Sequence, residues 1–155
     1  MAEYVCTPAA ERDIPFIAAT YEENIENLHG NSRDYATWQK LLCAPDAEYY
    51  VVRSDVPLAW FRVDTENGEL WLGMLQVSKT HQHRGIGKYI LSVVEAMAKE
   101  RGISTVGIHT TEDNIAARGL YAWAGYAVTE IGPCTTADGV DRVGYTFQKQ
   151  VKTSG

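Results

Sequence analysis

The stretch from Gln82 to Lys88, Gln-His-Arg-Gly-Ile-Gly-Lys, is suited to binding phosphate. Gly85 and Gly87 carry no side chain that would keep an anion away from the backbone. A helix predicted to begin near them directs its unpaired N–H groups and positive dipole end to the same place. Three basic side chains add donors and positive charge: His83, Arg84 and Lys88. Glycines before a helix are also typical of a plain strand-to-helix turn, so the loop alone leaves both interpretations open.

A second stretch, Asn114 to Tyr126, reads Asn-Ile-Ala-Ala-Arg-Gly-Leu-Tyr-Ala-Trp-Ala-Gly-Tyr. Its apolar residues follow a helical stripe that includes Tyr121, and Gly125 is placed to end the helix. Asn114 stands where an N-cap is expected. By position alone, Tyr121 is a candidate core residue and Asn114 an ordinary cap.

The elements around these stretches are predicted from periodicity and turn residues. A short strand at 3–7 precedes an amphipathic helix from about 11 to 28, and Ser32 is a candidate cap for a second helix. Strands follow at 48–53, 58–64 and 70–77, with Asn67-Gly68 favouring a type I′ hairpin. After the loop come a helix to Lys99, a strand at 105–110, a helix at 114–124 and closing strands at 126–131 and 142–151. A turn-rich loop with Gly132-Pro133 and Asp138-Gly139 separates the last two.

This order predicts one α/β domain over residues 1–155, with a mixed seven-stranded sheet and about four helices. An antiparallel meander precedes a strand-helix-strand crossover, whose two strands should be parallel. A doubly wound dinucleotide fold is disfavoured, because the glycine loop follows a meander and the acidic ribose-binding residue is not evident.

Composition narrows the function classes. The net charge of −6 and pI near 5.2 argue against a nucleic-acid partner. No run approaches the ~18 apolar residues of a membrane span, and the N-terminus does not resemble a signal peptide, so a cytoplasmic location is expected. The three cysteines are scattered, which indicates neither a disulfide framework nor a metal site.

Together the two stretches resemble the GNAT superfamily of acetyl-CoA-dependent N-acetyltransferases. Gln82 to Gly87 fits the family's Q/R-x-x-G-x-G/A loop, and Asn114 to Tyr126 fits its N-x-x-A-x-x-L-Y-x-x-x-G-F/Y signature. The match rests on both motifs in this order, about 30 residues apart with a strand pattern between them. It covers roughly residues 69 to 132, while the first 65 residues agree only in the order of elements.

The resemblance implies acetyl-CoA as co-substrate and no metal. The pantetheine arm is expected to pair with the backbone of Leu75, Gln76 and Val77, in a gap between two strands. The pyrophosphate is expected on the backbone amides of the loop, and Asn114 is implied to contact the cofactor. The implied cofactor-binding residues of the loop are His83, Arg84, Gly85, Ile86, Gly87 and Lys88.

The resemblance also implies catalytic roles. Tyr121 matches the family's tyrosine near the cofactor sulfur, where a phenol can protonate the leaving thiolate. His109 is the first candidate base for the attacking amine and Glu69 the second. The alternatives are a partly buried structural histidine and a solvated hairpin glutamate. Trp71 and Gly73, where relatives place an acid, put a direct carboxylate base in doubt.

The motifs specify neither the acceptor amine nor the acyl length, and they leave a homodimer open. Glu22, Glu23 and Glu26 are candidates for an acidic collar that favours a cationic acceptor, with Tyr21, Trp38 and Trp60 as aromatic walls. A solvated helix face is the alternative. The leading functional hypothesis is acetyl transfer to a primary amine of a small molecule or peptide. A non-catalytic acyl-CoA-binding or sensing module is the second, and a mononucleotide-binding protein the third, disfavoured because the P-loop ending is missing.

Overall fold

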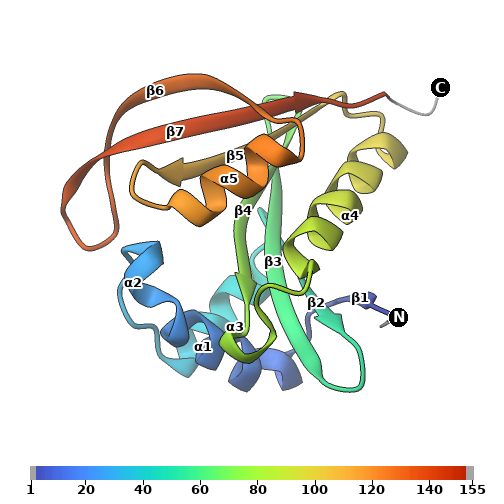
Figure 1. The fold of residues 1–155 in the computed structure, drawn as a ribbon. Coiled ribbons are helices and arrows are strands. Elements are labelled where there is room, and N and C mark those ends of the chain that lie inside the picture. The colour runs from blue at the N-terminus through green and yellow to red at the C-terminus, as the bar shows by residue number, and fades with distance from the viewer. Residues whose placement is uncertain (1–2, 153–155) are drawn as a thin grey trace.

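Seven strands form one mixed sheet in the order β1-β2-β3-β4-β5-β7-β6 (Figure 1). The computed structural model describes residues 3–152. Only the β4–β5 pair is parallel, as the predicted crossover requires. The strands are β1 Val5–Pro8, β2 Glu48–Arg53, β3 Pro57–Glu66, β4 Glu69–Val77, β5 Thr105–Thr111, β6 Ala127–Thr135 and β7 Asp141–Gln150.

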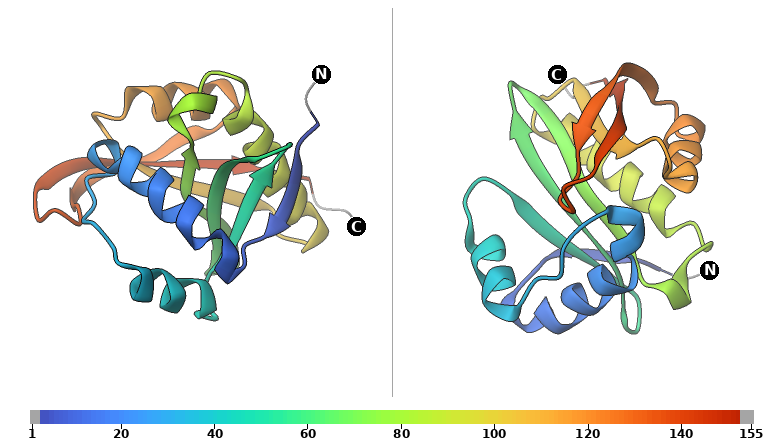
Figure 2. Two further views of the ribbon diagram at one scale, coloured as in Figure 1. Left: turned by 90° about the horizontal axis from the view of Figure 1, so that it is seen from below. Right: turned by 90° about the vertical axis from the view of Figure 1, so that its left-hand side faces the viewer.

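Helices cover both faces of the sheet (Figures 1 and 2). On one face, α4 and α5 pack over a core that includes Phe61, Leu72 and Val94. On the other face, α1 and α3 pack around a second core that includes Trp38, Val51 and Trp60. The helices are α1 Ile14–Glu23, α2 Ile25–Leu28, α3 Tyr35–Cys43, α4 Ile86–Glu100 and α5 Ile115–Trp123, with short 3-10 turns at Glu11–Asp13 and Lys79–His81. Between residues 3 and 152, no helix has the length and apolar composition needed to cross a membrane.

The parallel strands β4 and β5 part midway along the sheet. Pairing joins only Leu70, Trp71 and Leu72 of β4 to β5, although β4 continues to Val77. At the same point the register between β3 and β4 shifts, and Gly73 is the extra residue. A bulge bends its strand and increases the local twist. The bulge at Gly73 therefore accompanies the opening of a gap between two neighbouring strands.

The predicted helix over 11–28 is interrupted at Asn24. The Asn24 side chain leaves the helix pattern to donate from Nδ2 to the Val77 carbonyl at 3.1 Å. Its Oδ1 accepts from Gln82 Nε2 at 3.3 Å. These tertiary bonds hold the end of α1 against the end of β4, and the chain continues as the separate helix α2.

Two further predictions were wrong in detail. Asp34, not Ser32, caps α3, because its Oδ1 accepts from the backbone N–H of Thr37 at 2.8 Å. The stretch Gly132-Pro133 lies inside β6 rather than in a loop. Proline is tolerated there because β6 is at the edge of the sheet, where one side of the strand needs no ladder donor.

The tip of the β6–β7 hairpin lies beside the connection between α2 and α3 (Figure 2, right). Asn31 Nδ2 donates to the Ala137 carbonyl at 2.7 Å. The Asp138 amide donates to the His29 carbonyl at 3.0 Å. These two hydrogen bonds join the α2–α3 connection to the hairpin, about 100 residues further along the chain.

Candidate active site

Two cavities open at the gap between β4 and β5. The loop cavity, about 420 Å³, lies between the glycine loop and the helices α4 and α5. The hairpin cavity, about 470 Å³, lies under the β6–β7 hairpin and the α2–α3 connection. Both have the size of small-molecule sites, ~300–1,000 Å³. They share Leu28, Gly73, Met74, His109, Thr110 and Asn114, so ligands in the two cavities can meet at the gap.

The glycine loop forms one end of the loop cavity. His83 and Gly85 adopt positive φ, 64° and 81°, and α4 begins at Ile86 with its first amides unpaired within the helix. Gly87 packs so closely that a Cβ there would lie 3.0 Å from Leu120 Cδ2. The predicted residues that line this cavity are Leu75, Gln76, Val77, His83, Gly85, Ile86, Gly87, Lys88, Asn114 and Tyr121. Arg84 is exposed and does not line it.

The charge of the loop cavity differs from that of the whole chain. Histidines 81, 83 and 109 and Lys88 line it, and no aspartate or glutamate does so among the described residues. The chain as a whole carries 20 acidic against 14 basic side chains. An acid-free cavity in an acidic protein favours an anionic ligand.

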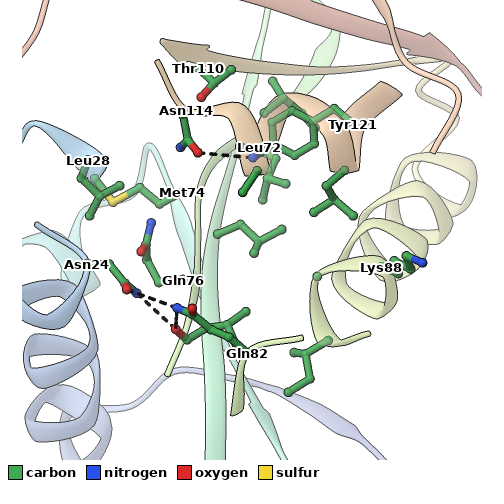
Figure 3. A pocket seen from close by; sticks show the side chains of 18 of the residues that line it. Asn24, Leu28, Leu72, Met74, Gln76, Gln82, Lys88, Thr110, Asn114 and Tyr121 are labelled. Carbon is green, nitrogen blue, oxygen red and sulfur yellow. Dashed lines mark hydrogen bonds between the residues drawn. The ribbon is translucent and has the colours of Figure 1, made fainter. Parts of the chain in front are cut away.

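The carbonyl of Val77 is already occupied. It accepts from Asn24 Nδ2 and from Gln82 Nε2, each at 3.1 Å (Figure 3). Gln82 is the first residue of the loop motif, and its side chain holds the loop against the end of β4. The predicted cofactor pairing of Val77 therefore cannot use this carbonyl without displacing two donors. Asn24 is buried and lines the cavity. It was not predicted as a site residue, because its hydrogen-bond partners are distant in the chain.

Tyr121 is both a core residue and part of the cavity wall. Its ring packs edge-on against Phe147 at 5.5 Å, and its side chain is 7% exposed. Figure 3 shows it on α5 above the cavity. Burial raises the pKa of Tyr121 to about 12. The phenol therefore stays protonated and can donate a hydrogen bond at neutral pH.

Asn114 caps α5 and also lines both cavities. Its Oδ1 accepts from the Ala117 amide at 3.2 Å, which caps α5. The same residue lines both cavities at their junction. The cap fixes the side chain beside the gap, where its amide can also face a ligand.

The two candidate bases have different positions. His109 lines both cavities, stacks on Trp71 with ring centroids 4.6 Å apart, and has Nδ1 3.1 Å from Thr146 Oγ1. Glu69 lies at the hairpin end of β4, where Oε2 accepts from Gln148 Nε2 at 2.8 Å. It lines neither cavity. His109 therefore lies where the two cavities meet, and Glu69 lies outside both of them.

The acidic collar does not reach the site. Glu22, Glu23 and Glu26 are exposed and line neither cavity. Of the predicted aromatic walls, Tyr21 lines the hairpin cavity, while Trp38 and Trp60 are buried in the core. The prediction of a cationic acceptor thus loses the carboxylates on which it was based.

Known structures share the fold of this chain. The ribosomal-protein-S18-alanine N-acetyltransferase from Escherichia coli is 18% identical and covers 99% of this chain and 97% of its own, with a TM-score of 0.75. An acetyltransferase from Salmonella typhimurium, solved with its cofactor acetyl-CoA, is 17% identical and covers 98% and 96%, with a TM-score of 0.76. At these identities the likeness is one of fold.

A sequence relative is the chloroplastic "GCN5-related N-acetyltransferase 10" from Arabidopsis thaliana. It is 30% identical over 73 residues, which span 47% of this chain and 28% of the relative. The model of the acetyltransferase (GNAT) family matches residues 16–126, well over half of the chain. The protein therefore belongs to the acetyltransferase (GNAT) family.

Proposed function

We propose that the protein transfers an acetyl group from acetyl-CoA to a primary amine of a small molecule or peptide. Transfer occurs by direct attack in a ternary complex, without an acyl-enzyme. The meeting of the two cavities at Gly73 and His109 carries this proposal. A donor in the loop cavity and an acceptor in the hairpin cavity would bring thioester and amine together, which lowers the entropic part of the barrier.

The loop cavity fits acetyl-CoA through three features. The amides that begin α4 and the positive-φ turn at Gly85 suit a pyrophosphate. The acid-free wall avoids repulsion of the phosphates. Within the described residues, β4 does not pair with β5 beyond Leu72, so backbone groups of Leu75 and Gln76 can bind the pantetheine amides.

Calorimetry and a turnover assay test the proposal together. CoA at 100 times its Kd should raise the free energy of unfolding by about 2.7 kcal/mol. Acetyl-CoA with a panel of primary amines should release free thiol and yield the acetylated amine. Binding of CoA without acetylation of any amine would support the non-catalytic binding module instead. Absence of CoA binding would overturn both hypotheses.

We infer that His109 accepts the proton of the attacking amine, directly or through a water. The ring lies at the junction of the cavities, and histidine is the side chain that changes charge near neutral pH. His109→Gln should lower kcat/KM about 100-fold at pH 7. The deficit of the variant should shrink as pH rises, because more of the acceptor amine in solution is then already deprotonated.

The measurement is a pH profile of kcat/KM for the parent and His109→Gln with one amine. Gln148→Ala is a control, because it removes a polar side chain near Glu69 and away from both cavities. Parallel profiles for the parent and His109→Gln would show that His109 is not the base.

A further inference from the structure

The hairpin cavity contains an arginine without a counterion. Arg33 lines this cavity, and its Nη1 is buried without a hydrogen-bond partner. No aspartate or glutamate within 3–152 forms an ion pair with it. A buried charged donor left without a hydrogen-bond partner destabilises the folded protein. Because Arg33 also lines an open cavity, its guanidinium is suited to an anionic ligand there.

The arginine is held in position by its neighbours. Its guanidinium carbon lies 4.7 Å from the ring centroid of Tyr21 and 5.0 Å from that of Trp38. The preceding connection is anchored by the Tyr21 hydroxyl, which donates to the Asn31 carbonyl at 2.9 Å, and by the Asn31 contact with the hairpin. Aromatic faces fix the planar group while leaving its in-plane N–H donors for a ligand.

A second guanidinium lies against the floor of the junction. Arg62 Nη1 is 3.1 Å from the position that a Cβ on Gly73 would occupy, and Arg62 Nε is buried without a partner. Gly73 lines both cavities. Among the hairpin-cavity residues, Glu130 is the only acid that the structure describes. Two guanidinium groups therefore lie in or beside the cavity wall, against one carboxylate in the lining that the structure describes.

We propose that the acceptor is an amine of amino-acid size whose carboxylate is bound by Arg33. This inference rests on the proposed function, because it places the amine at the junction beside His109 and the carboxylate in the hairpin cavity. Arg33 offers a planar fork that matches a carboxylate with two parallel hydrogen bonds. Arg62 adds positive potential beneath Gly73. The site would distinguish an amino acid from its amide by charge and not by shape.

The experiment compares L-amino acids with their carboxamides as acceptors, across several side chains, in the CoA-release assay. The parent protein should prefer the carboxylate member in kcat/KM by about 10- to 30-fold, the size of one charge-assisted pair. Arg33→Met keeps an unbranched side chain against Tyr21 and Trp38 and should lower this ratio to about 1. Arg12→Gln, an exposed arginine outside both cavities, is the control for net charge and should retain the parent ratio.

A binding measurement keeps the inference separate from turnover. Titration of the same amino acids and amides into CoA-saturated protein should show carboxylate preference in the parent and its loss in Arg33→Met. If no amine is acetylated but this preference is present, the proposed function fails and the anion site stands. If the parent prefers the amide, or if Arg33→Met keeps the carboxylate preference in either assay, the inference is overturned.

Discussion

Replacement of Tyr121 by phenylalanine is expected to lower kcat by about 10²- to 10³-fold, the usual loss when one donor to a developing charge is removed. The phenol of Tyr121 lines the loop cavity. Attack on a thioester places negative charge on the leaving sulfur. A donor at that atom stabilises the transition state more than the ground state.

The raised pKa of Tyr121 favours hydrogen-bond donation to the leaving thiolate over full proton transfer. A phenol of pKa about 12 is uphill as a full proton donor to a thiolate whose acid has a pKa of about 8.5. The difference of roughly 3.5 units corresponds to about 5 kcal/mol. We therefore expect a hydrogen bond that strengthens as charge develops, with the proton reaching the thiolate later from solvent.

The decisive measurement is the single-turnover rate, because product release can hide a chemical defect in kcat. Tyr126→Phe is the matched control. Its ring lies 6.4 Å from that of Tyr121, its hydroxyl donates to Glu95 Oε2 at 3.1 Å, and it lines neither cavity. It should lose about 1 kcal/mol of stability and keep the parent single-turnover rate. Equal single-turnover rates for Tyr121→Phe and the parent would refute the role of Tyr121.

Features encoded by neighbouring residues were predictable from the sequence. Asn67 and Gly68 have φ of 53° and 75°, as the predicted type I′ hairpin requires. The turn before α4 and the cap of α5 likewise follow from residues within one or two turns of each other. In each case the local backbone chemistry agrees with the final packing.

Features that depend on distant partners were not predictable. The helix break at Asn24 reflects bonds to Val77 and Gln82, more than 50 residues away. The bulge at Gly73 lies where the pairing of β4 with β5 ends, and β5 is distant from β4 in the chain. Glu69 was a reasonable candidate base by strand position, but the direction of β4 places it at the end away from the gap.

The acceptor side shows the same limit. Clustered charge at the end of α1 suggested a cationic acceptor, yet helix periodicity turns Glu22, Glu23 and Glu26 toward solvent. Arg33 lies in a connection with no regular structure and no motif. Arg33 becomes part of a cavity wall only through the packing of the hairpin against the α2–α3 connection. Local pattern therefore predicted the turn before α4 and the cap of α5, whereas the lining of the hairpin cavity depends on tertiary packing.

The second large effect is expected at Gly85. Its φ of +81° is a conformation that a β-branched residue avoids, and it forms the turn that leads the first amides of α4 into the loop cavity. Gly85→Val should weaken CoA binding about 100-fold, since ~2–3 kcal/mol of backbone strain would be relieved by moving the turn. Calorimetric titration with CoA measures this loss.

Gly102 provides the matched control at the other end of the same helix. It has a φ of +70°, a Cβ there would meet nothing within 4 Å, and the same is true of Gly85. Gly102→Val should therefore cost similar stability, roughly 2–3 kcal/mol, but it lies outside both cavities and should retain parent CoA affinity. If both variants lose affinity alike, the effect comes from general destabilisation of α4. If neither does, the amides that follow Gly85 do not hold the pyrophosphate.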